Sequence, residues 1–168
     1  MYEIGDLIIY GNTGVCRVTD ISSCDLMGDG DEQLCYFLEP LYHDYVISTP
    51  VDNTKVFMRP IITKEEAEQL IDTIPSLHVE AYHNSILRKL SEHYKSYIDT
   101  HECSDLIKLF ISIYTKKQNL EQQNRKFGQI DERFMKRAEE LLYGELAAAL
   151  EIPKNSVADY IADRIESQ

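Results

Sequence analysis

Hydrophobic and polar positions follow two different rhythms in the two parts of this 168-residue sequence. In the first 60 residues, short apolar runs alternate with turn-forming residues, which is typical of β-strands. The turns fall at Gly11–Gly14, Met27–Asp31 and Tyr42–Asp44, where Gly, Asn and Asp gather. The strands that we predict are Leu7–Tyr10, Gly14–Ile21, Glu32–Glu39, Val46–Thr49 and Val56–Arg59.

After Pro60 the apolar residues recur every three or four positions, as on one face of a helix. Thr63 and Glu66 have the spacing of a capping box that begins a helix, and Pro75 ends it. Further predicted helices cover Glu80–Ile98, Ser104 or Asp105 to about Asn124, a cap at Asp131 to Pro153, and Asn155 or Ser156 onward. We therefore predict an α+β protein, with a small SH3/Tudor-like antiparallel β-barrel at residues 1–61 and an all-α helical domain at 62–168.

Charge divides the chain in the same way as the hydrophobic pattern. The net charge is −12, which argues against a nucleic-acid contact over the whole surface. Residues 1–60 hold three basic and ten acidic side chains, whereas residues 88–137 hold eleven basic and seven acidic ones. The basic stretch either faces phosphate or coats solvated helix faces, and the acidic part is free to face a protein.

Cysteine spacing and the hydropathy pattern limit the classes of protein that fit. Cys16, Cys24, Cys35 and Cys103 include no C-x-x-C pair, and no pair of histidines near them has zinc-finger spacing. We expect small buried thiols, with neither a metal site nor a disulfide. No apolar run approaches the roughly 20 residues of a membrane span, and the N-terminus lacks signal features. We expect a cytoplasmic protein with no membrane contact.

Catalytic motifs are missing from the sequence. It contains no phosphate-binding G-x-x-x-x-G-K-[ST] loop, no G-x-G-x-x-G, no G-x-S-x-G and no H-E-x-x-H. We therefore expect a protein that is not an enzyme and that uses no cofactor and no small-molecule substrate. The remaining candidate is a contact surface, above all the short β-branched segment Asp44–Pro50, which is either an internal strand or an edge strand that accepts a partner strand.

Five parts of the sequence resemble, in order and spacing, the motifs of the CarD/CdnL family. They are Gly5–Tyr10 with Thr13–Val18 (G-D-x-V-V-Y followed by x-G-V-G-x-I in the family), Tyr36–Leu38 (its central strand), Ile47–Asn53 (its V-P-x-x-N turn), Met58–Ile62 (its barrel exit) and Ala138–Ala147 (A-x-x-x-L-x-x-E-L-A of its C-terminal domain). The resemblance spans nearly the whole chain and implies a bacterial transcription regulator of the stand-alone CdnL-like form, without catalytic activity.

The resemblance also implies partners and contact residues. The barrel would bind the β subunit of RNA polymerase, largely by strand addition. The helical domain would contact promoter DNA at the upstream edge of the transcription bubble, largely independently of sequence, and stabilise the open complex. The expected polymerase contacts are Arg17, Tyr45, Val46, Ile47, Ser48 and Thr49. The expected DNA contacts are Tyr82 as a wedge and Arg88, Lys89, Lys116, Lys117 and Arg133 at phosphates.

Two departures from the family pattern affect these expectations. The family places a tryptophan against the DNA, whereas this chain has no tryptophan, so Tyr82 or the neighbouring His83 would replace it. Ser48 stands where the family often has an arginine on the polymerase-facing strand. Two other functions therefore remain open. One is an adaptor whose barrel binds a different protein, without DNA contact. The other is a hydrolase or transferase, which would need a deep pocket with a perturbed ionisable group.

Overall fold

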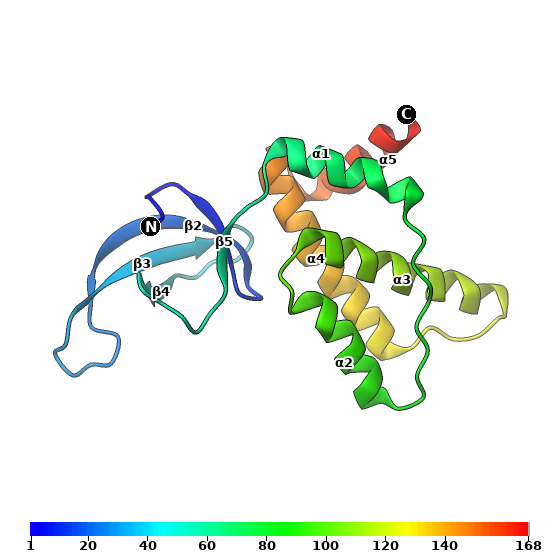
Figure 1. The fold of residues 1–168 in the computed structure, drawn as a ribbon, viewed down its shortest axis with the longest axis horizontal. Coiled ribbons are helices and arrows are strands. Elements are labelled where there is room, and N and C mark those ends of the chain that lie inside the picture. The colour runs from blue at the N-terminus through cyan, green and yellow to red at the C-terminus, as the bar shows by residue number, and fades with distance from the viewer. Residues whose placement is uncertain (168) are drawn as a thin grey trace. The chain divides into compact units, whose positions relative to one another are not determined.

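The computed structural model describes residues 1–167 as two compact units, one formed by Met1–Ile62 and one that begins at Thr63 (Figure 1). The first unit contains the strands β1 (Leu7–Tyr10), β2 (Gly14–Cys24), β3 (Gln33–Pro40), β4 (Ile47–Pro50) and β5 (Met58–Pro60). The second contains α1 (Lys64–Thr73), α2 (Leu87–Ile98), α3 (Cys103–Gln122), α4 (Gln129–Leu150) and α5 (Val157–Glu166), with short 3-10 turns η1 (Ile74–Ser76) and η2 (Lys154–Ser156). The predicted α+β fold class is confirmed.

The strands form one antiparallel sheet in the order β4-β3-β2-β1-β5. Within residues 1–167 no ladder joins β4 to β5, so the sheet is barrel-like but stays open at these two edges. The register between β2 and β3 shifts between Val18 and Asp20, which inserts a bulge. A bulge bends its strand and increases the local twist. This bend allows a sheet of few strands to enclose a small core.

The core of the sheet consists of Ile8, Cys16, Val18, Tyr36 and Leu38, all of which are buried. Arg17 separates Cys16 from Val18 as an exposed side chain, whereas Ile9, Val15 and Cys35 on the other face of the sheet are buried too, so both faces are partly covered. Burial raises the pKa of the Cys16 thiol to about 11, so this cysteine stays protonated and acts as a small apolar side chain, as predicted.

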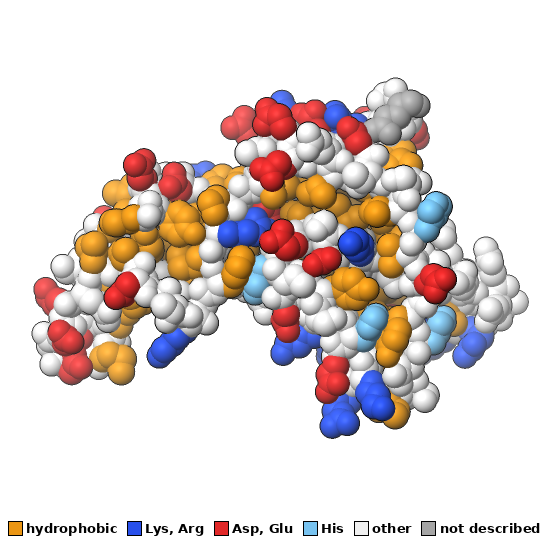
Figure 2. Space-filling model, viewed as in Figure 1, with side chains coloured by type: hydrophobic (Ala, Val, Ile, Leu, Met, Phe, Trp, Pro, Cys, Tyr) orange, Lys and Arg blue, Asp and Glu red, His pale blue; other side chains and the backbone are white. Residues whose placement is uncertain are grey.

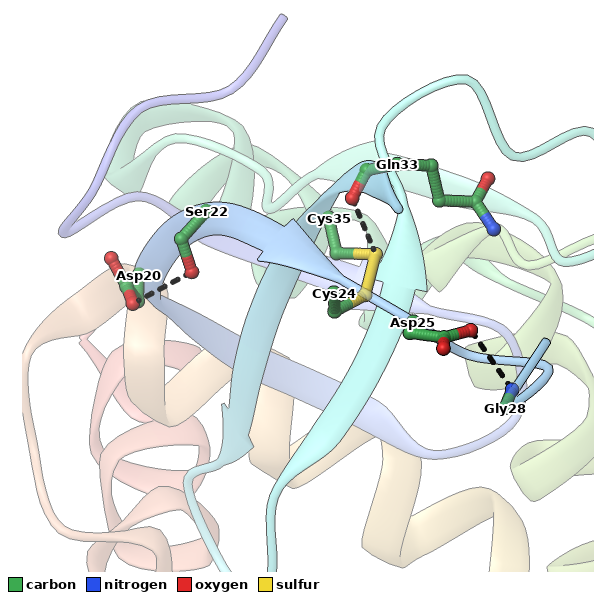
Figure 3. Close-up of a disulfide and its surroundings, with 7 residues drawn as sticks. All are labelled: Asp20, Ser22, Cys24, Asp25, Gly28, Gln33 and Cys35. Carbon is green, nitrogen blue, oxygen red and sulfur yellow. Dashed lines mark hydrogen bonds between the residues drawn. A yellow bond between two sulfur atoms is a disulfide. The ribbon is translucent and has the colours of Figure 1, made fainter. Parts of the chain in front are cut away.

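Cys24 and Cys35 form a disulfide bond, so the expectation that the chain has no disulfide is wrong (Figure 3). The ladder places Cys24 opposite Gln33 and Cys35 opposite Ser22, which makes the two cysteines diagonal neighbours. Their Cα atoms lie 6.1 Å apart, within the usual range for a disulfide. A separation of 11 residues has no motif character in the sequence, and only the β2–β3 hairpin brings the two thiols together.

The loop closed by this disulfide is organised by one acidic side chain (Figure 3). The carboxylate of Asp25 accepts the N–H groups of Gly28 at 2.9 Å and Gly30 at 2.8 Å. Both glycines have positive φ angles, of 71° and 83°, which glycine adopts without strain. The Asp25 carboxylate, directly after β2, therefore holds two backbone N–H groups of the β2–β3 turn in place.

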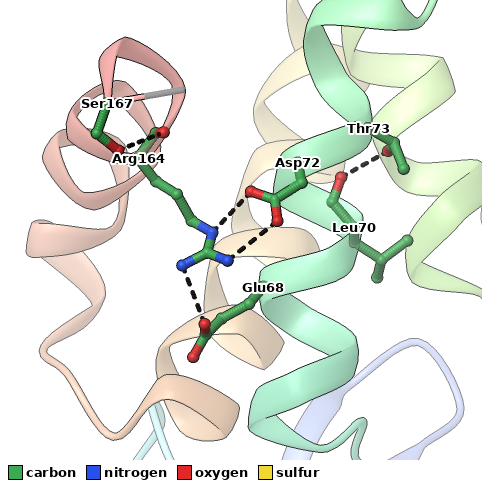
Figure 4. Close-up of polar contacts among 6 residues, drawn as sticks. All are labelled: Glu68, Leu70, Asp72, Thr73, Arg164 and Ser167. Carbon is green, nitrogen blue, oxygen red and sulfur yellow. Dashed lines mark hydrogen bonds and ion pairs between the residues drawn. The ribbon is translucent and has the colours of Figure 1, made fainter.

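The helical unit begins at the predicted capping box. The Thr63 hydroxyl accepts the N–H of Glu66 at 3.1 Å, and the Glu66 carboxylate accepts the N–H of Thr63 at 3.2 Å. A cap of this kind contributes about 1 kcal/mol to helix stability. The other end of the chain is tied to the same helix. Arg164 of α5 donates to both carboxylate oxygens of Asp72, at 2.7 and 3.0 Å, and contacts Glu68 at 2.9 Å (Figure 4).

Helix α2 begins at Leu87, so the prediction of a helix from Glu80 is wrong for its first seven residues. Polar side chains hold this segment in another conformation. The Ser112 hydroxyl of α3 donates to the Glu80 carbonyl at 2.8 Å, and the Asn84 side chain accepts the N–H of Ile86 at 2.9 Å. Side-chain bonds to the backbone, the first from a distant helix and the second local, compete with helical hydrogen bonds. Residues 77–86 therefore form a non-helical connecting segment, which contains Tyr82.

Candidate functional site

Strand β4 is an edge strand, and its pairing to β3 determines which backbone groups face outward. The N–H of Val51 donates to the carbonyl of Leu34 at 3.0 Å, one step beyond the last ladder pair. Bonded and non-bonded pairs alternate along an antiparallel ladder, so this bond fixes the phase. The backbone groups of Ile47 and Thr49 therefore point toward β3. Those of Ser48 point away from it, toward the open edge.

The side chains of β4 divide between the two faces of the sheet. Ile47 packs against the buried core and Thr49 is only 2% exposed, so these two predicted contact residues offer backbone at most. Ser48 is exposed on the outer face. Tyr45 and Val46 precede the strand and are 50% and 57% exposed, which makes them the large apolar side chains nearest the edge.

Arg17 lies further from the edge than the other predicted contacts. It belongs to β2, which β3 separates from β4, and it faces Glu39 across the β2–β3 ladder. The register places it on the same face of the sheet as Ser48, and its side chain is exposed. The structure thus brings Tyr45, Val46 and Ser48 together, with Arg17 two strands away.

In the helical unit, Tyr82 stacks on His93 of α2. The two ring centroids lie 3.6 Å apart with an angle of 14° between the planes. Asn84 donates to the Tyr82 hydroxyl at 3.1 Å, and Tyr97 meets His93 edge-on at 5.5 Å. Burial lowers the pKa of His93, which favours the neutral imidazole. Tyr82 is thus half-buried and held in a fixed orientation, while the alternative wedge residue, His83, is exposed.

Further ring contacts connect this pair to the start of α4. Tyr94 lies 5.9 Å from His93 and 5.5 Å from Phe134, measured between ring centroids. The Arg133 guanidinium lies over the Phe134 ring at 5.1 Å, and the Lys117 ammonium lies 5.6 Å from the centroid of Phe127. Tyr82 therefore belongs to one continuous aromatic cluster, which we define as Tyr82, His93, Tyr94, Tyr97 and Phe134. Arg133 lies against the Phe134 end of this cluster.

Basic side chains lie at the start of α2. Arg88 and Lys89 are exposed in its first turn, and Figure 2 shows Lys and Arg side chains gathered where this helix begins. Arg88 forms an ion pair with Glu92 at 3.9 Å, with the two side chains 79% and 67% exposed. An ion pair this exposed contributes little, so Arg88 can exchange it for another anion.

Lys116 is not part of this exposed surface. Its side chain is 8% exposed, and its ammonium lies 3.0 Å from the Asp131 carboxylate. The Tyr94 hydroxyl donates to the same oxygen at 2.6 Å, and burial, followed by this bond, raises the pKa of Tyr94. Lys116 cannot bind a DNA phosphate from this position, because it is buried and already neutralises the Asp131 carboxylate. We therefore leave Lys116 out of the DNA surface proposed below.

Sequence reasoning missed two residues that shape this region. Asp131 was expected to cap a helix, but Gly128 is the N-cap of α4, and Asp131 lies inside the first turn with only 4% of its surface exposed. His93 stands four residues after Lys89, and this spacing places it on the same side of α2. That spacing was the only signal that could have pointed to it.

Residues 1–167 contain neither a metal-binding group nor a helix that could span a membrane. No group of three His, Cys, Asp or Glu side chains there could hold a metal ion. Among the described helices, none has the length and apolar character needed to cross a membrane.

β4 is thus an open sheet edge, a feature to which other proteins can add a strand. Residues 2–62 match the family model described as the CarD-like/TRCF RID domain. The N-terminal unit is therefore a CarD-like RNA-polymerase-interacting domain, as the motifs between Gly5 and Ile62 predicted. The match ends where the first unit ends, so the resemblance at Ala138–Ala147 stays a prediction. A comparison with curated proteins gives no match.

Proposed function

We propose that this protein is a non-catalytic transcription regulator that binds the β subunit of RNA polymerase through β4 and stabilises the promoter open complex through its helical unit. The observation that carries the proposal is the open edge of β4 within a CarD-like RNA-polymerase-interacting domain. Its outward N–H and C=O at Ser48 can pair with an extended segment, while Tyr45 and Val46 add apolar contact area.

A proline substitution tests docking at this edge directly. Ser48→Pro removes the outward N–H but no bond to β3, and proline is tolerated where a strand N–H faces solvent. We expect co-elution with RNA polymerase core from a related bacterium to weaken by about tenfold or more, the effect of one lost hydrogen bond and a steric block. Ser48→Ala keeps the N–H and should bind like the wild type.

Two results would contradict this docking model. Equal co-elution of Ser48→Pro would place the polymerase contact elsewhere on the domain. Failure of the wild-type protein to co-elute, even at low salt, would remove the polymerase assignment for this chain. A charged residue at Ile47 would be a poorer test, because that side chain packs against the core and its replacement would disturb folding.

For DNA we propose that Tyr82 contacts a base step at the bubble edge, supported from behind by His93. Arg88, Lys89, Lys117 and Arg133 would meet backbone phosphates around it. The half-buried rings of the aromatic cluster, which pack on the buried Tyr94, and the cations have the composition of a surface that binds unpaired bases and phosphates together. A tyrosine offers less stacking area than the tryptophan of the family, so we expect a weaker contact.

Binding to a forked duplex with a short single-stranded end tests this surface. Tyr82→Ala should weaken binding about tenfold by removing one stacking contact, while Tyr82→Phe should keep most of the affinity. Lys89→Ala should reduce the salt slope by about one charge, whereas Lys64→Ala, on α1, should leave it unchanged. Wild-type affinity for Tyr82→Ala in fluorescence anisotropy would reject the stacking role.

The adaptor without DNA contact is the second candidate. It is favoured by the net charge of −12 and by the absence of tryptophan. It predicts no salt-dependent affinity of the wild-type protein for forked DNA, so the same titrations separate the two functions.

A further inference from the structure

A small hollow lies beside the edge strand, where the chain turns from β3 into β4. Its volume is about 180 Å³, and all of its lining comes from the N-terminal unit. The lining residues are Glu39, Pro40, His43, Asp44, Tyr45 and Val46. Ligand pockets for small molecules usually measure about 300–1,000 Å³, so this hollow suits a single side chain better than a free metabolite.

The lining has the chemistry of a cation site. Glu39 and Asp44 are exposed carboxylates, and the rings of His43 and Tyr45 stack with centroids 5.9 Å apart and an angle of 29° between planes. Carboxylates form strong charge-assisted hydrogen bonds with ammonium and guanidinium groups, and aromatic faces attract the same groups. No lysine or arginine contributes to the lining.

Arg17 is the basic residue closest in register, and it faces Glu39 across the β2–β3 ladder. It can therefore compensate part of the Glu39 charge. Asp44 lies in the β3–β4 connection, where no ladder partner stands opposite. The Asp44 carboxylate is thus the stronger candidate for a cation supplied by another molecule.

The position of the hollow, directly before β4, indicates that its ligand is part of a strand added at this edge. Tyr45 and Val46 line it and come directly before Ile47, the first residue of β4. A strand added along the open edge passes this point at one of its ends. The ten acidic and three basic residues of positions 1–60 also favour approach by a positively charged segment.

We propose that the hollow binds one arginine or lysine side chain of the extended protein segment that pairs with β4. This inference rests on strand addition in the proposed function, but not on the identity of the partner. The backbone bonds at Ser48 would provide pairing, and the cation in the hollow would fix the register and direction of the added strand. The site thus distinguishes basic strands from neutral ones.

The test uses the full chain and synthetic peptides rather than polymerase. Extended peptides of about six residues, rich in Val and Thr, carry either arginine or its neutral analogue citrulline at each position in turn. Binding is followed by the NMR shifts of the backbone amides around the hollow and β4. We expect the best arginine peptide to bind about fivefold or more tightly than its citrulline counterpart, with the largest shifts at Asp44, Tyr45 and Val46.

Matched variants decide whether the hollow causes this preference. Asp44→Asn should abolish it and Glu39→Gln should reduce it, whereas Asp52→Asn, an exposed carboxylate beyond β4, should leave it unchanged. Equal affinity for arginine and citrulline, a preference that survives Asp44→Asn, or no shift with any arginine peptide would each overturn the inference. An arginine preference without polymerase co-elution would retain the hollow and reject the polymerase assignment. Co-elution with polymerase without an arginine preference would retain the polymerase assignment and reject the cation site in the hollow.

Discussion

Replacing Lys116 with alanine is expected to destabilise the helical unit by about 3–5 kcal/mol. The side chains of Lys116 and Asp131 are 8% and 6% exposed, so the substitution leaves a buried carboxylate that has lost its cation and still accepts a hydrogen bond from the Tyr94 hydroxyl at 2.6 Å. Taking one charge from such a pair costs far more than the net contribution of the pair itself. Urea unfolding followed by the helical circular dichroism signal measures the loss of free energy of unfolding.

The neighbouring lysine provides the control. Lys117 lies 5.6 Å from the centroid of the Phe127 ring, and Lys117→Ala should cost about 0.5–1 kcal/mol. The double variant Lys116→Met with Asp131→Asn removes both charges and keeps an acceptor for Tyr94, so it should recover most of the stability. A loss below about 1 kcal/mol for Lys116→Ala would show that the pair is solvated.

Loss of the Cys24–Cys35 disulfide is expected to destabilise the N-terminal unit by about 3 kcal/mol, because the bond closes a loop of roughly a dozen residues in the unfolded chain. The double variant Cys24→Ser, Cys35→Ser shows this loss without any reductant. Thermal unfolding followed by the NMR signals of Tyr36 reports on this unit, since Tyr36 is buried in its core.

Two controls separate the disulfide from other effects of reduction. Reductant should lower the stability of the wild-type unit and leave the double variant unchanged. Alkylation of the unfolded, unreduced protein should modify only Cys16 and Cys103, whose thiols lie outside the disulfide, and all four cysteines after reduction. Alkylation of all four without reduction would contradict the bond.

The hydrophobic periodicity predicted most of the fold, because within each helix or strand the buried residues recur at regular spacing along the sequence. The short apolar runs that contain Ile8, Cys16, Val18 and Leu38 are visible in the sequence, and so is the capping box at Thr63. The start of α2 was missed because its determinant, the bond from Ser112 to Glu80, joins residues 32 positions apart. No local pattern contains that information.

The candidate site was predicted less completely than the fold, for a related reason. Lys116 follows Leu109 and Ile113 and precedes Leu120 at helical spacing, so it lies within the apolar stripe of α3. That position was a signal of burial, but its partner Asp131 comes from another helix, and composition alone counts every lysine as surface charge. The diagonal pairing of Cys24 and Cys35 likewise depends on the register of the hairpin.

The proline at the end of β4 has a consequence for self-association. Pro50 has no N–H, and the N–H groups of Ile47 and Thr49 point toward β3, so Ser48 supplies the only outward donor within this strand. Two copies of the chain that met edge to edge through β4 would form very few hydrogen bonds. The edge is therefore protected against the strand-by-strand stacking that leads to aggregation, and a stable complex needs a partner that also brings side-chain contacts.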